Sequence, residues 1–135
     1  MNTNVKIFIA VIVLLVVGTI VSVVSGFGKV GDDGTPGKYD DLAMCLKEKG
    51  AVFYGAFWCP HCQTQKKMFG KSAKLLPYVE CSTPDGNGQT QICMEKNIEG
   101  YPTWEFADGS RLNGEVSFAA LAEKTGCEVP VETIE

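Results

Sequence analysis

Apolar residues are distributed unevenly along the chain. Residues 7–24 form a continuous apolar run, IFIAVIVLLVVGTIVSVV, without a charged side chain. As a helix rising about 1.5 Å per residue, this run nearly spans a bilayer core of about 30 Å. Residues 26–38 are rich in glycine and aspartate, a composition typical of a flexible linker. The pattern predicts a transmembrane anchor over residues 1–25, a linker over 26–38 and a folded domain beyond.

The charges beside the apolar run favour one orientation in the membrane. Lys6 and the amino terminus precede the run, whereas Lys29 and then Asp32 and Asp33 follow it. By the positive-inside rule, the N-terminus is expected in the cytoplasm and the domain outside it. A cleaved signal peptide ending at Ser25 is the alternative, but the run is longer than a usual signal core. Both interpretations place the domain outside the cytoplasm. The uncleaved anchor predicts a single-pass protein of the cell membrane.

Helical and extended patterns alternate from residue 39 onward. Asp40 is predicted to cap a helix over 41–49, and the apolar run at 51–58 predicts a buried strand. Cys59-Pro60-His61-Cys62 follows at once, and Pro60 suits the first turn of a helix that would run to Leu76.

The second half of the chain predicts shorter elements. These are a strand at 78–81, a loop at 84–88, a helix at 89–97, a hairpin of strands 103–107 and 111–113, and a helix from 117 to 125. The resulting order, α-β-α-β-α-β-β-α, predicts an α/β domain over 39–127, with a mixed central sheet covered by helices on both faces. Residues 128–135 are expected to be a C-terminal tail.

Charge and cysteine content narrow the possible functions. The net charge of −4 gives no reason to expect nucleic acid as a partner. Six cysteines are many for 135 residues, and in an oxidising compartment cysteines pair into disulfides.

Cys59 and Cys62 are the strongest candidates for chemistry. A C-x-x-C pair where a buried strand turns into a helix places the first sulfur at the helix N-terminus, which favours the thiolate. Cys59 is therefore expected to be the attacking residue, and Cys62, one turn away, the resolving one. A partly cationic His61 would stabilise the Cys59 thiolate further and make the disulfide more oxidising.

A zinc site is the alternative for this motif. Structural zinc needs four ligands, but the chain has one histidine, inside the motif, and no second C-x-x-C. We therefore predict no metal site and no cofactor.

The combined motifs extend beyond C-x-x-C. The segments YGAFWCPHCQTQKKMFG (54–70), YVEC (78–81), the later Cys93 and GYPTWEF (100–106) resemble the thioredoxin fold. They are especially similar to the thioredoxin-like domain associated with vitamin K epoxide reductase homologues. The CPHC sequence also resembles that of a periplasmic disulfide oxidant. The similarity covers roughly residues 40 to 126.

This resemblance implies several residue roles. Pro102 would form a cis peptide bond facing Cys59 and Cys62, and Tyr101 before it would offer backbone groups to a substrate chain. A membrane reductase of the vitamin K epoxide reductase type would reoxidise the pair and pass electrons to a quinone. Thioredoxin-like proteins usually keep a buried acid six residues before the first cysteine, a position occupied here by Phe53.

The other cysteines are predicted to be structural. Cys81 and Cys93 flank a glycine-rich loop, so a disulfide between them would stabilise it, with a second redox relay as the alternative. Cys45 and Cys127 form a possible second pair, although intermolecular bonding or free thiols remain open.

The aromatic residues divide into two groups. Trp58, beside Cys59 at a strand end, is expected to be partly exposed and to contact substrate. The others near the motif are expected to lie in the core, namely Phe53, Tyr54, Phe57 and Trp104.

The sequence therefore predicts an extracytoplasmic dithiol–disulfide oxidoreductase that oxidises cysteine-containing exported proteins. A reductase or isomerase supplied with electrons across the membrane would use the same residues in the opposite direction. A non-catalytic module that binds zinc or a partner protein is a third hypothesis.

Overall fold

The computed structural model describes residues 2, 3, 5–7, 9–15 and 35–131. The chain divides into two units, Met1–Thr35 and Pro36–Glu135. In the first unit, the described residues 3, 5–7 and 9–15 are helical. No helix among the described residues has the length and apolarity to cross a membrane. The predicted span at 7–24 lies largely outside the described residues.

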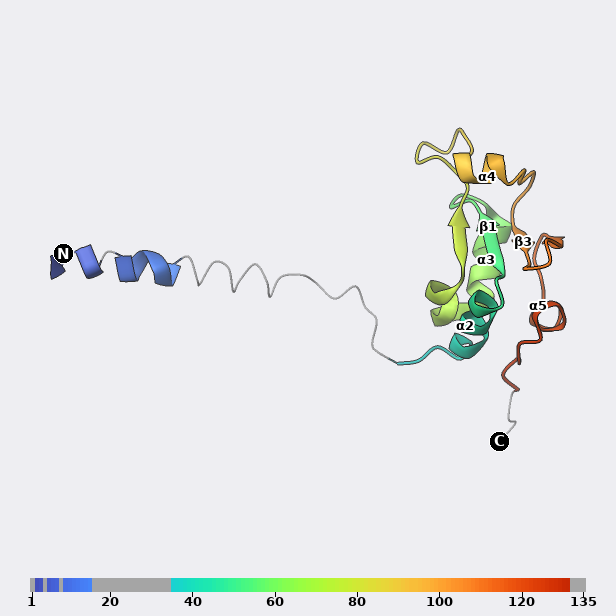
Figure 1. The fold of residues 1–135 in the computed structure, drawn as a ribbon, viewed down its shortest axis with the longest axis horizontal. Coiled ribbons are helices and arrows are strands. Elements are labelled where there is room, and N and C mark those ends of the chain that lie inside the picture. The colour runs from blue at the N-terminus through green and yellow to red at the C-terminus, as the bar shows by residue number, and fades with distance from the viewer. Residues whose placement is uncertain (1, 4, 8, 16–34, 132–135) are drawn as a thin grey trace. The chain divides into compact units, whose positions relative to one another are not determined.

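The second unit is built around a four-stranded mixed sheet of order β2-β1-β3-β4. Strand β1 (Val52–Gly55) pairs in parallel with β2 (Tyr78–Glu80) and antiparallel with β3 (Thr103–Glu105). Strand β4 (Arg111–Asn113) pairs antiparallel with β3 and completes the predicted hairpin. In Figure 1 the β2 arrow points toward α4 (Gln91–Glu95), so the carboxyl ends of the parallel pair lie at that end.

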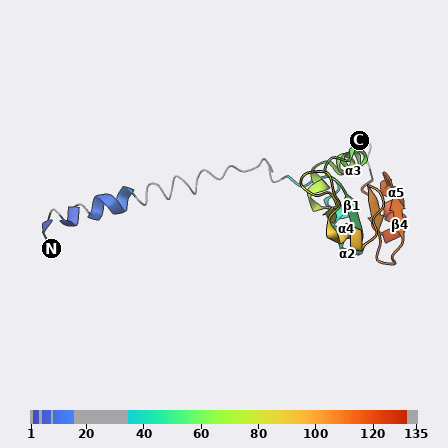
Figure 2. The ribbon, with the colours of Figure 1, turned by 90° about the horizontal axis from the view of Figure 1, so that it is seen from above.

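Helices cover both faces of the sheet, as predicted. Residues alternate between faces along a strand, so neighbouring Phe53 and Tyr54 belong to different clusters of buried side chains. Phe53 and Trp104 pack with residues of α2 (Asp40–Glu48), α3 (Pro60–Phe69) and α5 (Phe118–Thr125). Tyr54 packs with Cys93 of α4 on the opposite face. Figure 2 shows the folded unit from above, with α5 and β4 on one side of β1.

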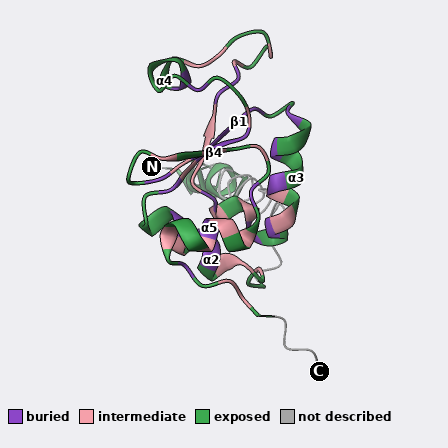
Figure 3. Ribbon diagram, turned by 90° about the vertical axis from the view of Figure 1, so that its right-hand side faces the viewer, coloured by how far each residue is buried: buried purple, intermediate pink, exposed green. Residues whose placement is uncertain are grey.

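Burial follows this arrangement. The larger cluster includes Leu42, Phe69 and Leu121, which are fully or almost fully buried. In Figure 3 buried segments of α2, α3 and α5 gather in the body of the unit, whereas α4 and its preceding loop are mostly exposed or intermediate. The single helix α4 therefore covers its face of the sheet less completely.

Several predicted boundaries were wrong. The first helix begins at Asp40, which does not cap it; the Asp40 carboxylate instead accepts a hydrogen bond from the Gly37 N–H at 2.9 Å. The strand predicted to reach Trp58 ends at Gly55, because the Cys59 N–H bonds the Ala56 carbonyl and closes a turn.

The two middle helices are also shorter than predicted. The helix predicted to reach Leu76 ends at Phe69, because Gly70 has a positive φ of 55°, and a 3-10 helix, η1 (Gly70–Leu75), follows. Helix α4 is shortened at both ends. Before its start, the Gln89 side-chain amide donates a hydrogen bond to the Ile98 carbonyl. After its end, Asn97 adopts a positive φ of 52°.

Candidate active site

The turn after β1 places Cys59 at the start of α3. Cys59 is the N-cap residue, and its sulfur accepts a hydrogen bond from the Cys62 N–H at 3.3 Å. Pro60 occupies the first turn of the helix, where its missing N–H leaves no bond unmade. A sulfur in this position receives backbone N–H groups and the positive end of the helix dipole, both of which stabilise a thiolate.

Cys62 has a different environment although it lies one turn away. It is 0% exposed, and Cys59 is 4% exposed. Burial, reinforced by a hydrogen bond with the Cys59 side chain, raises the pKa of the Cys62 thiol to about 12. The sulfur of Cys59, which caps the helix, suits the attacking residue predicted for the pair. The neutral, buried thiol of Cys62 suits the resolving residue.

Cys59 faces the loop before β3. Its thiol donates to the Tyr101 carbonyl at a sulfur–oxygen distance of 3.7 Å, and the Tyr101–Pro102 peptide bond is cis, as the resemblance implied. A chain bound beside Cys59 would therefore lie against the backbone of this loop. The Tyr101 hydroxyl accepts a bond from Gln89 at 2.7 Å, which holds the loop to the segment before α4.

Two aromatic side chains are exposed beside Cys59. Trp58 is 53% exposed, its indole N–H donates to the Ser82 hydroxyl at 2.8 Å, and its ring lies edge-on to Tyr101 with centroids 6.0 Å apart. Phe57 was predicted to be a core residue, but it is 47% exposed because the chain has already left the sheet at this position.

His61 is exposed and meets a carboxylate. Its Nδ1 lies 2.7 Å from a carboxylate oxygen of Glu115, and its side chain is 69% exposed. This carboxylate partner was not apparent from the sequence, because 54 residues separate the two positions. When His61 is protonated, it therefore forms an ion pair with Glu115.

Gln65 is a buried polar residue that the sequence analysis missed. Its amide accepts the Val116 N–H at 2.7 Å and donates to the Val116 carbonyl at 3.1 Å. These two bonds fix the backbone beside Glu115 against α3, and so position the carboxylate that meets His61. The sequence signal was weak, since a glutamine among lysines suggests only a solvated helix face.

The other four cysteines form two disulfides, Cys81–Cys93 and Cys45–Cys127. Cys81 and Cys93 are fully buried, which favours a structural role over a relay that a thiol partner must reach. Cys59 and Cys62 are thus the free cysteines of the described residues. Within the same residues, no group of three or more His, Cys, Asp or Glu side chains is placed to hold a metal ion.

Sequence comparison agrees with this architecture. The family model described as thioredoxin matches residues 37–125, which include every strand of the sheet and the C-x-x-C motif. The chain belongs to the thioredoxin family. The mixed α/β sheet, the thiols at the start of α3 and the loop of Pro102 are the thioredoxin-like arrangement of this unit.

Several curated relatives share this thioredoxin region. The chain is 52% identical over 90 residues to "Thiol-disulfide oxidoreductase LTO1" of Arabidopsis thaliana, covering 63% of this chain and 23% of that protein. It is 34% identical over 82 residues to "Protein disulfide-isomerase A2" of Mus musculus, covering 55% of this chain and 15% of that protein. The chain therefore matches less than a quarter of the length of either relative.

This thioredoxin domain lacks a buried acid behind the cysteine pair at the position noted in the sequence. Phe53 is fully buried there, and its ring stacks on Trp104 with centroids 4.8 Å apart. An ionised carboxylate in this apolar stack would be unfavourable. A charge near the buried Cys62 must therefore come from an element other than β1.

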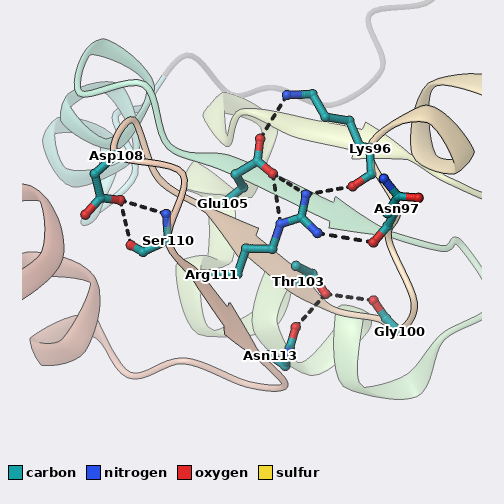
Figure 4. Close-up of polar contacts among 9 residues, drawn as sticks. All are labelled: Lys96, Asn97, Gly100, Thr103, Glu105, Asp108, Ser110, Arg111 and Asn113. Carbon is teal, nitrogen blue, oxygen red and sulfur yellow. Dashed lines mark hydrogen bonds and ion pairs between the residues drawn. The ribbon is translucent and has the colours of Figure 1, made fainter.

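A polar cavity of about 540 Å³ is lined by Gly100 and Thr103, on either side of Tyr101 and Pro102 in the sequence, and includes none of the predicted site residues. Arg111 reaches from β4 to Glu105 and to the carbonyls of Lys96 and Asn97 (Figure 4). The Thr103 hydroxyl, also in the wall, donates to the Gly100 carbonyl at 2.8 Å. The polar groups that line this cavity form hydrogen bonds and ion pairs with neighbouring groups. They therefore hold the hairpin of β3 and β4 to the loop after α4.

Proposed function

We propose that this chain is an extracytoplasmic thiol–disulfide oxidoreductase that oxidises exported proteins. The observation that carries the proposal is the pair of free thiols at the start of α3, with Cys59 against the Tyr101 carbonyl. The names of the relatives, a thiol-disulfide oxidoreductase and a protein disulfide-isomerase, support the same chemistry.

The reaction begins with Cys59 and Cys62 joined as a disulfide. A substrate thiolate attacks the Cys59 sulfur, a mixed disulfide forms, and Cys62 leaves as a thiolate that takes up a proton. A second substrate thiolate then attacks the substrate sulfur of the mixed disulfide and releases Cys59. The substrate loses two electrons and gains a disulfide, and the Cys59–Cys62 pair is reduced.

The apolar run at residues 7–24 is proposed to anchor the domain in the cell membrane. The run lacks charge, and described side chains within it, such as Val11, Leu14 and Leu15, are at least half exposed. Exposed apolar side chains at consecutive positions of a helix are favourable in lipid and unfavourable in water. The N-terminus is proposed to lie in the cytoplasm.

The proposed partner for reoxidation is a membrane reductase of the vitamin K epoxide reductase type. The motif resemblance over residues 54–106 supports this choice. Tethering by the linker 26–38 would keep Cys59 at a high effective concentration near the membrane surface. A weak docking contact would then be enough for electron transfer from the reduced pair to the partner.

Trapping the mixed disulfide tests this proposal. In Cys62→Ala the resolving thiol is gone, so Cys59 should remain joined to exported proteins and to the membrane reductase. Membranes carrying the variant are run on a non-reducing gel, and the trapped species are identified by mass spectrometry. The Cys59→Ala/Cys62→Ala double variant is the control and should trap nothing. Zinc bound to the purified protein, with no trapped thiol partner, would contradict the proposal.

The opposite direction is the second candidate. The similarity to "Protein disulfide-isomerase A2" favours a reductase or isomerase, which would need electrons supplied across the membrane. The reduction potential of the Cys59–Cys62 couple separates the two. A reduction potential of about −120 mV indicates an oxidant, and one of about −270 mV indicates a reductant.

A further inference from the structure

Cys62 must lose its proton whenever the reduced pair is reoxidised, yet it is fully buried and its pKa is raised to about 12. Three titratable side chains influence it from the surrounding elements. Cys59 approaches from the turn, Lys66 from the next turn of α3, and Tyr78 from β2. Of these three, Lys66 is the group that carries a positive charge, which favours the Cys62 thiolate.

The packing around Gly55 brings Cys62 and Tyr78 together. A Cβ atom at Gly55 would lie 3.0 Å from the Cys62 sulfur and 2.9 Å from Cε2 of Tyr78. The sulfur and the edge of the ring therefore approach the same point on β1. A side chain at this position would push them apart, which explains why the strand has glycine here.

Lys66 packs on the same Tyr78 ring. Its ammonium lies 3.3 Å from the centroid of the Tyr78 ring, within cation–π distance, and residues four apart share one face of a helix. The ring is held in turn, because the Tyr78 hydroxyl donates to the Glu80 carboxylate at 2.7 Å. Glu80 also accepts the Phe57 N–H at 3.2 Å, so the cation, the ring and the turn before Cys59 belong to one network.

We propose that Lys66, positioned by the Tyr78 ring, is the charge partner of the Cys62 thiolate during resolution of the mixed disulfide. This inference rests on the proposed function. Cys59 thiolate attacks a partner disulfide and releases one partner thiolate. Cys62 then gives its proton to solvent and attacks the Cys59 sulfur, and the second partner thiolate leaves. Two thiols become one disulfide, and the partner disulfide takes up the two electrons.

The two steps can be followed separately with dithionitrobenzoate, an aromatic disulfide that releases one coloured thiolate at each step. The reduced full chain, in mild detergent, is mixed with one equivalent of the reagent in a stopped-flow instrument. The first phase reports attack by Cys59 and the second reports resolution by Cys62. In Lys66→Gln, the second phase should be about three- to tenfold slower at pH 7, and its pH profile should move to higher pH. The first phase should be changed much less.

Two variants control the result. Lys67→Gln removes the neighbouring charge on α3 and should leave the second phase unchanged. Lys66→Arg keeps the positive charge and should restore most of its rate. An unchanged second phase in Lys66→Gln, or equal slowing in Lys66→Arg and Lys66→Gln, would overturn the proposal. Absence of both phases in the unsubstituted protein would instead refute the oxidoreductase function itself.

Discussion

At the scale of single residues, the two cysteines of the pair have different environments because of their positions in the fold. Cys59 caps α3 and meets the Tyr101 carbonyl, whereas Cys62 is enclosed by β1, β2 and α3. The same helix turn thus holds one sulfur at the positive end of the helix dipole and one that is fully buried. This difference supports the proposal that Cys59 attacks and Cys62 resolves.

His61 is expected to tune the potential of the pair. In His61→Ala, the reduced Cys59 loses a neighbouring residue that can carry a positive charge, so the disulfide should be about three- to tenfold harder to reduce in equilibrium with glutathione. Glu115→Gln should shift the equilibrium less, because it removes only the partner of His61. A disulfide equally or more easily reduced in His61→Ala would show that His61 has no such role.

At the scale of elements, covalent and ionic links hold segments that have little core of their own. The disulfide Cys81–Cys93 closes the loop between β2 and α4, and Cys45–Cys127 ties α2 to the segment after α5. Glu105 of β3 pairs with Lys96 beyond α4 and with Arg111 of β4. These links fix the edge strand and the short helix around the site.

Replacing Cys81 and Cys93 together with alanine should lower the free energy of unfolding by about 3 kcal/mol, because the loop they close regains its entropy in the unfolded chain. The loop closed by Cys45 and Cys127 is longer, so its removal should cost about 4.5 kcal/mol in the same model. Urea unfolding of the oxidised proteins measures both. If dithiol turnover disappears in a folded Cys81→Ala/Cys93→Ala protein, the pair is a redox relay and not a structural disulfide.

The Glu105 ion pairs should make the hairpin sensitive to acid. Burial raises the pKa of Glu105, but Arg111 and Lys96 outweigh it and hold the pKa below its usual value of 4.5. A lowered folded-state pKa gives stability that is present above 4.5 and is lost as the pH falls through the lowered value.

Glu105→Gln should therefore cost about 1 kcal/mol at pH 7 and progressively less below about pH 4.5. Urea unfolding of both proteins between pH 7 and pH 3 measures this difference. An equal loss for Glu105→Gln at all pH values would contradict an ionic contribution.

At the scale of the whole molecule, the folded unit and the N-terminal apolar run serve different purposes. The folded unit contains all of the cysteines and both disulfides. The run is proposed to keep this unit at a membrane, which would restrict it to partners at the same surface.

The anchor predicts a clear behaviour on fractionation. The full chain should stay in the membrane pellet after washing at alkaline pH. Val13→Asp/Leu14→Asp should release it, because each central aspartate costs about 3 kcal/mol in a membrane helix. Met94→Asp, at an exposed position of α4, is the control and should remain in the pellet. Release of the unsubstituted chain by the same wash would refute the anchor.

Sequence pattern alone was enough to predict the order of elements, the start of the helix at Pro60 and the candidate pair Cys59 and Cys62. These features depend on local patterns, such as apolar runs, proline and glycine positions and the spacing of two cysteines. The resemblance to thioredoxin-like domains then supplied the expectation for Pro102, which local pattern alone did not favour.

Only the tertiary structure decided what surrounds the pair. The contacts of Lys66 with the Tyr78 ring, of His61 with Glu115, and of Gln65 with Val116 join different elements. The early end of β1 and of the helix before Gly70 likewise followed from a turn and a backbone angle that competed with good apolar patterns. Local pattern sets which segments are helical or extended, but the ring that holds Lys66 and the carboxylate that meets His61 depend on which segments pack together.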